Sequence, residues 1–215
     1  MYKYKCVIFD CDGVLVDSEP IGNIVLVEMA NELGAKIDLN YAYKYFKGNS
    51  LQAVVDLISK LVTQKFDDDL FITQYRDRSY TAFKEQIKPI VGIEEVIKGL
   101  RIPYCVASSG PLEKIKLNLS LTGLLPYFED NIFSCYSIQK WKPDPAIFLL
   151  AAKTMGFLPE ECLVVEDSKI GIQAAKNGGF DVCGYTEHDY KNELEEDSDI
   201  TIDKMSSLPS VLTNI

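Results

Sequence analysis

The chain has 215 residues, of which 47% are hydrophobic and 25% are charged, which suits one large domain or a core with an inserted module. Its formal net charge is −10, and this argues against general binding to the phosphate backbone of nucleic acids. No uninterrupted apolar run reaches the roughly 18 residues of a membrane span, so we expect no membrane segment and no membrane partner.

The six cysteines are scattered without a C-x-x-C pair, and several fall within apolar runs. We expect free thiols in a cytoplasmic protein, with neither a zinc site nor a disulfide framework. The amino terminus lacks the cleavage region of a signal peptide and leads directly into an apolar run. The one histidine, His188, lies in a polar segment, so a Ser-His-Asp hydrolase or a histidine-ligated metal site is not expected.

The first apolar run, residues 6–9, is typical of a strand buried on both faces of a parallel sheet. It ends at Asp10 and Asp12, which are followed by Gly13, a residue that allows a tight turn. Ligands of open α/β sheets bind beyond the carboxyl ends of the strands. Two neighbouring carboxylates repel one another unless a cation or a proton offsets their charge. The pair is a candidate for chemistry, although a bare D-x-D also suits an ordinary acidic turn.

The next segment, residues 17–88, predicts helices only, because no strand-like alternation interrupts it. Apolar residues recur at helical spacing, and Asn49 or Ser50 precedes one stretch as a candidate cap. The expected helices cover residues 21–33, 40–46, 51–62 and 67–86. Four helices without a strand predict a small separate module that is inserted after the first strand.

From residue 89 onward strands and helices alternate, which implies a parallel sheet covered on both faces. The expected strands cover residues 104–107, 131–135, 162–165, 181–185 and, with a weaker pattern, 200–202. The expected helices cover residues 91–100, 112–121, 145–155 and 170–176. We therefore predict an α/β protein with a Rossmann-like parallel-sheet core, residues 1–16 and 89–215, and an inserted all-helical domain, residues 17–88.

Polar side chains follow several of these strands. Ser108 and Ser109 precede a helix whose amino terminus could hold a phosphate. Lys142 begins a K-P-D-P stretch before another helix, and Glu166 and Asp167 form a second acid pair at a strand end. Taken singly, these features also suit a serine cap, a solvated lysine and a complement to a helix dipole. Their order along one sheet indicates a site.

This order is D-x-D, then a hydroxyl, then K-P-D-P, then E-D-S, and it resembles the four motifs of the haloacid dehalogenase (HAD) superfamily of phosphoryl-transfer enzymes. The core, about two thirds of the chain, matches the family's order of elements, and the helical insertion matches its type 1 cap. The stretches Q-K-W-K-P-D-P-A and G-I-Q-A-A resemble the branch that holds β-phosphoglucomutase and small sugar-phosphate phosphatases, in particular the bacterial 6-phosphogluconate phosphatase type.

The resemblance implies a role for each polar residue. Asp10 would be the nucleophile that forms an aspartyl-phosphate, and Asp12 would act as general acid and then as general base. Lys142 would neutralise charge at Asp10 and at the phosphoryl oxygens, which Ser108 and the backbone around Ser109 would also hold. An acid at Asp12 argues against a dehalogenase, because that branch of the superfamily lacks it.

The resemblance also implies a Mg²⁺ site. Asp10, the backbone carbonyl of Asp12 and Asp167 would supply oxygen ligands, and Glu166 would bind directly or through water.

Substrate selectivity would come from the helical domain, where Lys47, Gly48 and Asn49 form a candidate binding turn. The β-phosphoglucomutase branch has an arginine shortly after its Lys-Gly, where this chain has Leu51, and a histidine early in its first cap helix, which this chain lacks. We therefore expect a monomeric, Mg²⁺-dependent phosphatase for a small phosphorylated sugar or sugar acid, with 6-phosphogluconate as the first choice.

Two other functions are compatible with the same residues. The first is a phosphomutase of the β-phosphoglucomutase type. The second is a Mg²⁺-binding switch that is phosphorylated without turnover, as receiver domains are, although those are shorter and have no insertion after the first strand. The sequence does not identify the physiological substrate.

Overall fold

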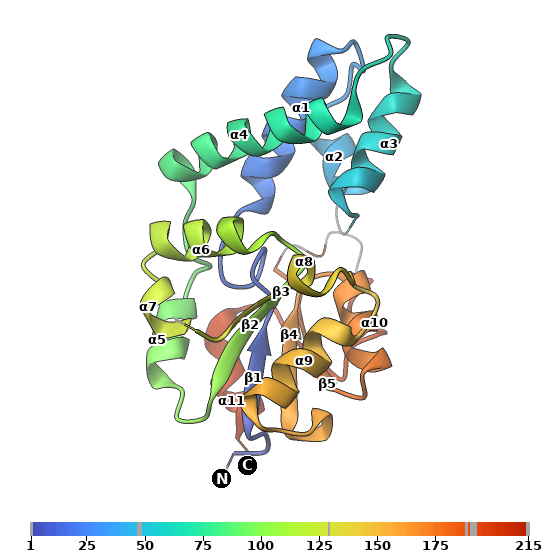
Figure 1. The fold of residues 1–215 in the computed structure, drawn as a ribbon. Coiled ribbons are helices and arrows are strands. Elements are labelled where there is room, and N and C mark those ends of the chain that lie inside the picture. Colours follow the sequence, from blue (N-terminus) through green and yellow to red (C-terminus); the bar gives the residue numbers. More distant parts are fainter. Residues whose placement is uncertain (1, 47–48, 129, 188, 190–192, 214–215) are drawn as a thin grey trace. The chain divides into compact units, whose positions relative to one another are not determined.

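The computed structural model describes residues 2–46, 49–128, 130–187, 189 and 193–213. The chain forms two compact units, of which the first comprises Met1–Asp17 and Lys88–Ile215 and the second Ser18–Ile87. The first unit contains the sheet, and the second is helical (Figure 1). The predicted fold class, a parallel-sheet α/β core with an inserted all-helical domain, is confirmed.

The sheet formed by the described residues has six strands in the order β3-β2-β1-β4-β5-β6, and every neighbouring pair is parallel. The strands are β1 (Cys6–Phe9), β2 (Tyr104–Ser108), β3 (Ile132–Ser134), β4 (Cys162–Glu166), β5 (Asp181–Tyr185) and β6 (Ile200–Ile202). Because β1 lies between β2 and β4, the residues that follow it stand at the middle of the carboxyl edge, where ligands of such sheets bind.

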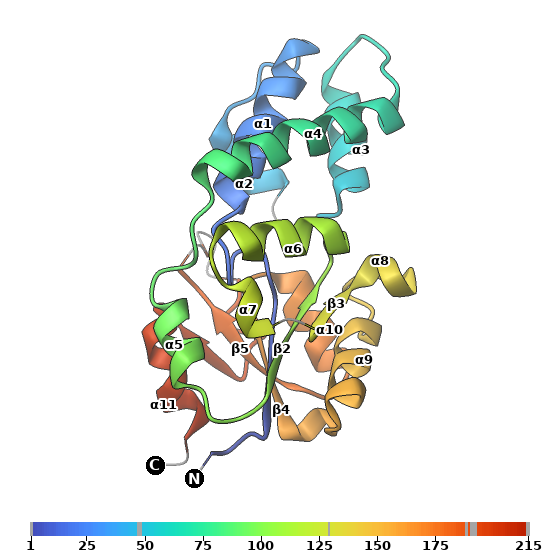
Figure 2. The same ribbon diagram turned by 60° about the vertical axis from the view of Figure 1, so that its left-hand side comes forward.

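Helices cover both faces of this sheet (Figures 1 and 2). They are α5 (Ile93–Gly99), α6 (Leu112–Leu121), α7 (Leu125–Phe128), α8 (Cys135–Ile138), α9 (Ala146–Met155), α10 (Lys169–Asn177) and α11 (Leu208–Leu212), with 3₁₀ turns η1 (Pro159–Glu161) and η2 (Met205–Ser207). Alternate residues of β1, Cys6 and Ile8, pack in one core cluster with residues of α9 and α10. On the other face Phe128 of α7 packs edge-on against Phe9. All four residues of β1 are therefore fully buried, as the apolar run predicts.

The helical unit consists of α1 (Glu19–Glu32), α2 (Leu39–Tyr45), α3 (Leu51–Leu61) and α4 (Asp68–Gln86). Side-chain oxygens cap three of these helices: Asp38 accepts a hydrogen bond at the start of α2, Ser50 at the start of α3 and Asp67 at the start of α4. Of the two cap candidates for α3, Ser50 is the one used. The unit has its own apolar core, to which all four helices contribute.

The short elements differ most from the sequence prediction. The strand expected over residues 131–135 is shorter, because Cys135 begins α8 and Ser134 caps that helix by accepting a hydrogen bond from the Tyr136 amide. The four- and five-residue helices α7, α8 and α11 were not predicted. Helices of little more than one turn are too short to show a helical repeat of apolar residues.

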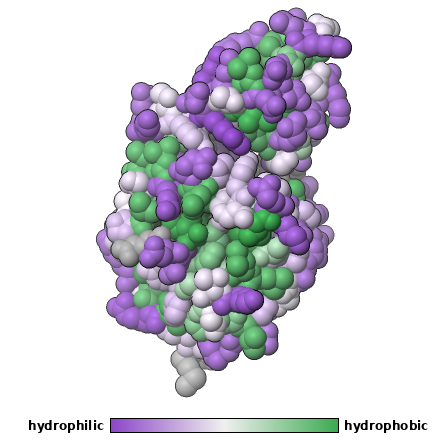
Figure 3. Space-filling model, viewed as in Figure 1, coloured by the Kyte–Doolittle hydropathy of each residue, from purple (hydrophilic) through white to green (hydrophobic). Residues whose placement is uncertain are grey.

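The six cysteines are buried and free. None of the helices built by the described residues combines the length and the hydropathy that a membrane crossing requires. Figure 3 shows hydrophilic and hydrophobic side chains interspersed on one face of the protein. Among the large apolar side chains at the surface are Trp141, Leu149 and Leu158 of the sheet-containing unit, and scattered exposure of this kind is normal for a folded protein.

Candidate active site

The carboxyl ends of three neighbouring strands bring predicted site residues to one edge of the sheet. Asp10 directly follows β1, Ser108 ends β2 and Glu166 ends β4. The Asp10 amide donates a hydrogen bond to the Val165 carbonyl of β4 over 3.0 Å, which extends the ladder between these strands to the site. All three site residues are buried, so the sheet itself sets their positions.

Lys142 joins two of these acids. Its Nζ lies 2.6 Å from Asp10 Oδ1 and 2.5 Å from Glu166 Oε1, and it also donates to the Ala107 carbonyl over 3.2 Å. The lysine side chain is 5% exposed, and those of Asp10 and Glu166 are 10% and 1% exposed. Buried charges of this kind are tolerated only when they are paired and hydrogen-bonded. One ammonium group therefore compensates two buried carboxylates.

The pKa values of the pair follow from burial and from these charges. Burial raises the pKa of the Asp10 carboxyl above its usual range, and the Lys142 ammonium opposes the rise. Burial lowers the pKa of Lys142, but the Asp10 and Glu166 carboxylates raise it by more, so its pKa lies above the usual range. The lysine stays charged, and any further positive charge near Asp10 would favour its ionised form.

Asp10, Glu166 and Asp167 form a group of acids that could hold a metal ion. One carboxylate oxygen from each lies within 4.8 Å of the others, and all three residues are buried. Glu166 Oε2 accepts hydrogen bonds from the Asp167 amide and from the amide and hydroxyl of Ser168. Carboxylate oxygens held this close suit a hard cation such as Mg²⁺, which prefers oxygen ligands. The donor set therefore fits the predicted ion.

Two glycines allow close approach to these acids. Gly13 has a φ of +81°, and a Cβ on it would overlap the Asp167 carboxylate. Gly171 lies in the first turn of α10, and a Cβ there would overlap the Glu166 carboxyl group. Asp167 and Glu166 are both buried, so their carboxylates cannot swing aside into solvent. A side chain at either position would displace a candidate metal ligand.

Replacing Gly171 by alanine is expected to weaken Mg²⁺ binding by about 10- to 100-fold, the usual cost of disturbing a group that orients a ligand. The added methyl group overlaps the Glu166 carboxylate and displaces it from its present place beside Asp10 and Asp167. Calorimetric titration of the metal-free protein with Mg²⁺ measures the effect. Gly99→Ala is the matched control, because nothing lies within 4 Å of a Cβ at that helical glycine. Wild-type Mg²⁺ affinity in Gly171→Ala would contradict the close approach.

The two serines of the predicted phosphate cradle differ in exposure. Ser108 is buried, and its Oγ accepts a hydrogen bond from the Gly110 amide over 3.0 Å. Ser109 is exposed on the turn between β2 and α6. The turn is tied to β3, since the Ser134 hydroxyl donates to the Gly110 carbonyl over 2.6 Å. Both serine hydroxyls thus lie on a turn whose Gly110 is hydrogen-bonded to Ser108 through its amide and to Ser134 through its carbonyl. This turn leads into the amino terminus of α6.

Asp12, the second acid of the first motif, pairs with a lysine that the sequence analysis did not identify. Lys114 Nζ lies 2.8 Å from both Oδ1 and Oδ2 of Asp12. This lysine is the third residue of α6, directly downstream of the predicted cradle. Its spacing from the S-S-G turn was a usable signal, but a lysine in the first turn of a helix is commonly solvated.

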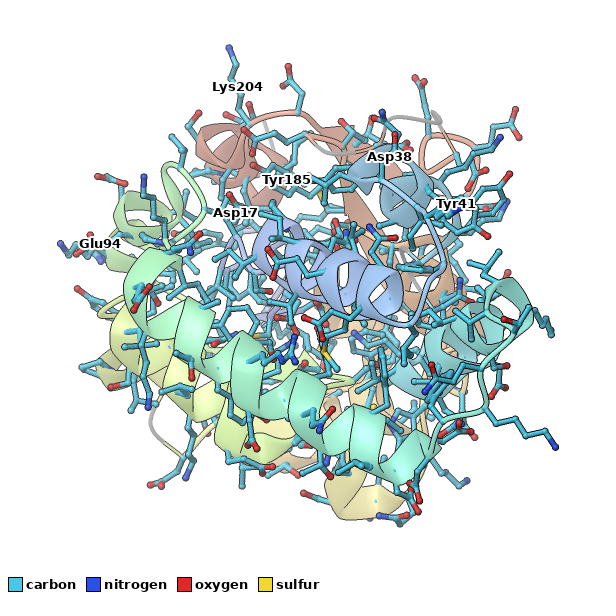
Figure 4. All side chains as sticks on the ribbon, turned by 90° about the horizontal axis from the view of Figure 1, so that it is seen from above. Asp17, Asp38, Tyr41, Glu94, Tyr185 and Lys204 are labelled. Atoms are coloured by element: carbon cyan, nitrogen blue, oxygen red, sulfur yellow. The ribbon has the colours of Figure 1, made fainter. Side chains whose placement is uncertain are left out.

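Another unpredicted residue lies at the end of β5. The Tyr185 hydroxyl donates a hydrogen bond to Glu187, and the charge of Asp17 acts on the same phenol (Figure 4). Burial, the bond to Glu187 and the charges of Asp17 and Asp167 raise the pKa of this phenol. Tyr185 therefore remains a neutral hydrogen-bond donor beside the acids at this edge.

The candidate binding turn of the helical unit is only partly visible. Lys47 and Gly48 lie outside the described residues, and so does His188. Asn49 is exposed, and its Nδ2 donates to the Tyr45 carbonyl over 2.9 Å. That bond ties the end of α2 to the start of α3.

Comparison with known proteins agrees with this geometry. The haloacid dehalogenase-like hydrolase family matches residues 4–179. The 6-phosphogluconate phosphatase of Escherichia coli (strain K12) is 33% identical over 211 residues, which cover 98% of this chain and 96% of that protein. The chain therefore belongs to the haloacid dehalogenase-like hydrolase family, and the resemblance inferred from its motifs is confirmed.

Solved structures show the same fold over nearly the whole chain. A conserved haloacid dehalogenase-like protein from Agrobacterium tumefaciens str. C58 is 29% identical with a TM-score of 0.87, and the match covers 97% of each chain. A HAD family hydrolase from Deinococcus radiodurans R1, solved with bound phosphate and sodium, is 26% identical with a TM-score of 0.80 and covers 99% of this chain and 96% of that one.

Proposed function

We propose that this protein is a Mg²⁺-dependent phosphatase that releases inorganic phosphate from a small phosphorylated sugar or sugar acid. The observation that carries the proposal is the buried group of Asp10, Glu166 and Asp167 at the carboxyl edge of the sheet, with Lys142 paired to the first two acids. Membership of a hydrolase family and a phosphatase relative that is matched over 96% of its length support it. A site this acidic can accept a phosphate ester only with added positive charge.

Asp10, Asp167 and the backbone carbonyl of Asp12 are the proposed Mg²⁺ ligands. Glu166 already accepts hydrogen bonds from Lys142 and Ser168, which favours contact with the ion through water. When bound, the ion would supply positive charge beside the phosphoryl oxygens and would favour the ionised form of Asp10.

In the proposed reaction a carboxylate oxygen of Asp10 forms a bond to phosphorus while the bond from phosphorus to the ester oxygen breaks. Asp12 gives its proton to the departing ester oxygen. It then takes a proton from the water that attacks the aspartyl-phosphate, so that phosphate leaves and the Asp10 carboxylate is restored. Lys142, Ser108 and the backbone at Ser109 hold the phosphoryl oxygens throughout.

We place substrate selectivity in the helical unit, as the family resemblance implies. Lys47 could pair with the carboxylate of a sugar acid such as 6-phosphogluconate, the substrate named for the Escherichia coli relative. Leu51 begins α3 and cannot bind the second phosphate of a bisphosphate, which a phosphomutase must hold. Leaving that charged group unpaired would cost about 1–3 kcal/mol or more. Hydrolysis is therefore favoured over isomerisation.

A panel of phosphorylated sugars and sugar acids, assayed for released phosphate in the presence of Mg²⁺, tests the proposed function. We expect turnover of 6-phosphogluconate and related small esters. Incubation with β-glucose 1-phosphate and a trace of the 1,6-bisphosphate separates the alternatives. Glucose 6-phosphate that forms faster than free phosphate would identify a phosphomutase. Phosphorylation without turnover of any ester, including p-nitrophenyl phosphate, would identify a switch protein.

Removal of the metal is expected to abolish phosphate release, because Lys142 already compensates two carboxylates and the phosphate dianion would then meet Asp10 without further positive charge. Excess EDTA should lower the rate to background, and added Mg²⁺ should restore it. Ca²⁺, which is larger and has looser geometry, should bind in competition with Mg²⁺ and support turnover poorly. Full activity in EDTA would remove the ion from the mechanism.

A further inference from the structure

We propose that Lys114 is a positioning residue, which holds the carboxyl group of Asp12 where it can give a proton to the departing ester oxygen and take one from the attacking water. This inference rests on the proposed phosphatase function and assigns a partner to its acid and base. Two observations support it: the contact between Lys114 and Asp12, and the hydrogen-bonded backbone around each of these residues.

The contact itself involves both oxygens of the Asp12 carboxylate. Both Asp12 oxygens lie 2.8 Å from the same ammonium nitrogen, Lys114 Nζ. The side chains are 22% and 28% exposed, respectively, for Lys114 and Asp12. A cation that contacts both oxygens restrains the position of the carboxyl group and the direction in which the aspartate side chain points.

Asp12 and Lys114 both lie in segments whose backbone is held by hydrogen bonds. Asp12 belongs to a tight turn in which the Gly13 amide donates to the Val16 carbonyl over 2.8 Å. Lys114 lies in the first turn of α6, after the hydrogen-bonded turn at Gly110, and its Cδ would lie 3.7 Å from a Cβ on that glycine. The lysine stem thus runs along the cradle turn toward Asp12.

The pair separates the acids of the site into two sets. Lys142 compensates Asp10 and Glu166, whereas Lys114 pairs with Asp12. A partly exposed ion pair contributes little to folding stability. Loss of Lys114 should therefore change proton transfer more than it changes the fold.

The test compares substrates that differ in their need for an acid. An alkyl phosphate requires protonation of its leaving oxygen, whereas the p-nitrophenolate of p-nitrophenyl phosphate leaves readily without it. In Lys114→Met we expect the single-turnover rate of phosphoryl transfer to fall about 100-fold for the alkyl ester, the scale of a misplaced catalytic group. For p-nitrophenyl phosphate we expect a fall of less than about 3-fold, because general acid catalysis contributes little there. The retained rate also shows that the variant is folded.

Three further variants make the assignment specific. Lys116→Met, on an exposed position of the same helix, should leave both rates unchanged. Lys114→Arg, which can pair with both carboxylate oxygens, should recover most of the alkyl-ester rate. If Lys114 acts through Asp12, then Lys114→Met should cause no further loss in an Asp12→Asn background.

The same measurements can overturn the inference. Equal losses on both esters, or a full additional loss in the Asp12→Asn background, would show that Lys114 does not act through Asp12. A raised KM with an unchanged single-turnover rate at saturation would make it a substrate-binding residue instead. A wild-type protein that cleaves neither ester would contradict the proposed function itself, which is a different result.

Discussion

Replacing Asp10 by asparagine is expected to lower phosphate release by roughly 10⁶-fold, as removal of the nucleophile does in other covalent hydrolases. The amide keeps the shape of the carboxyl group but cannot form the aspartyl-phosphate. The substitution also removes one negative charge from the predicted Mg²⁺ site. Steady-state release of phosphate from 6-phosphogluconate, or from p-nitrophenyl phosphate, measures the loss.

The fold should survive this change. The neutral amide of Asp10→Asn would relieve the repulsion with Glu166, and Lys142 would keep that glutamate as a partner, so we expect the free energy of unfolding to change by less than about 1 kcal/mol. Asp181→Asn is the matched control, because Asp181 begins β5 and pairs with Lys3 away from the site. Near-wild-type turnover in Asp10→Asn, repeated in Asp10→Ala, would remove Asp10 from the mechanism.

Replacing Lys142 by methionine is expected to have the largest effect on stability. In EDTA, we expect the free energy of unfolding to fall by about 3–5 kcal/mol, the usual cost of removing one partner from a buried ion pair. Methionine can keep the packing against Phe148, over whose ring Nζ lies 4.8 Å from the centroid. The loss is therefore electrostatic, because Asp10 and Glu166 remain buried side by side without their cation. Urea unfolding measures it.

The sign of the pH dependence follows from the same pair. In Lys142→Met a proton on Asp10 removes its repulsion with Glu166, and burial makes the folded state hold that proton more tightly than the unfolded state. The free energy of unfolding of Lys142→Met therefore falls furthest below that of the wild type at alkaline pH, and the difference shrinks as the pH falls. Saturating Mg²⁺ should restore part of the stability, about 2.7 kcal/mol at 100 times its Kd.

Lys140→Met is the control for that variant. Lys140 lies two residues away and pairs with Asp144 over 3.7 Å, with side chains 59% and 42% exposed. Its replacement should change stability by less than about 1 kcal/mol. Equal deficits in the two variants would show that the buried pairs of Lys142 are not the cause.

The fold was largely predictable because its strands are short apolar runs at regular intervals. The run ending at Asp10 and the run ending at Glu166 both became neighbouring central strands, and the parallel order then brought their acids together. The short helices α7, α8 and α11 were missed, because their stability comes from packing against neighbouring elements rather than from a local repeat. Cys135 illustrates this: it continues an apolar run in sequence but begins a helix in the structure.

The candidate site was predictable only where a side chain is tied to a strand end. Asp10 and Glu166 occupy such positions, and the order of motifs added Lys142. Lys114 was missed because its partner, Asp12, is 102 positions away in sequence, and only the placement of α6 beside the first turn joins them. The role of Gly171 was also missed, because only the structure shows that its lack of a side chain makes room for the Glu166 carboxyl group at the end of β4.

Trapping of the phosphorylated enzyme tests the central claim most directly. Protein mixed with excess substrate and Mg²⁺, quenched and reduced with borohydride, should contain homoserine at position 10, because borohydride reduces an aspartyl-phosphate to that residue. Peptide mass spectrometry should find the change at Asp10 and not at Asp12, Asp17 or Asp167, and it should disappear when Mg²⁺ is omitted. Turnover without a trapped residue at position 10, or with the label on another acid, would contradict the account.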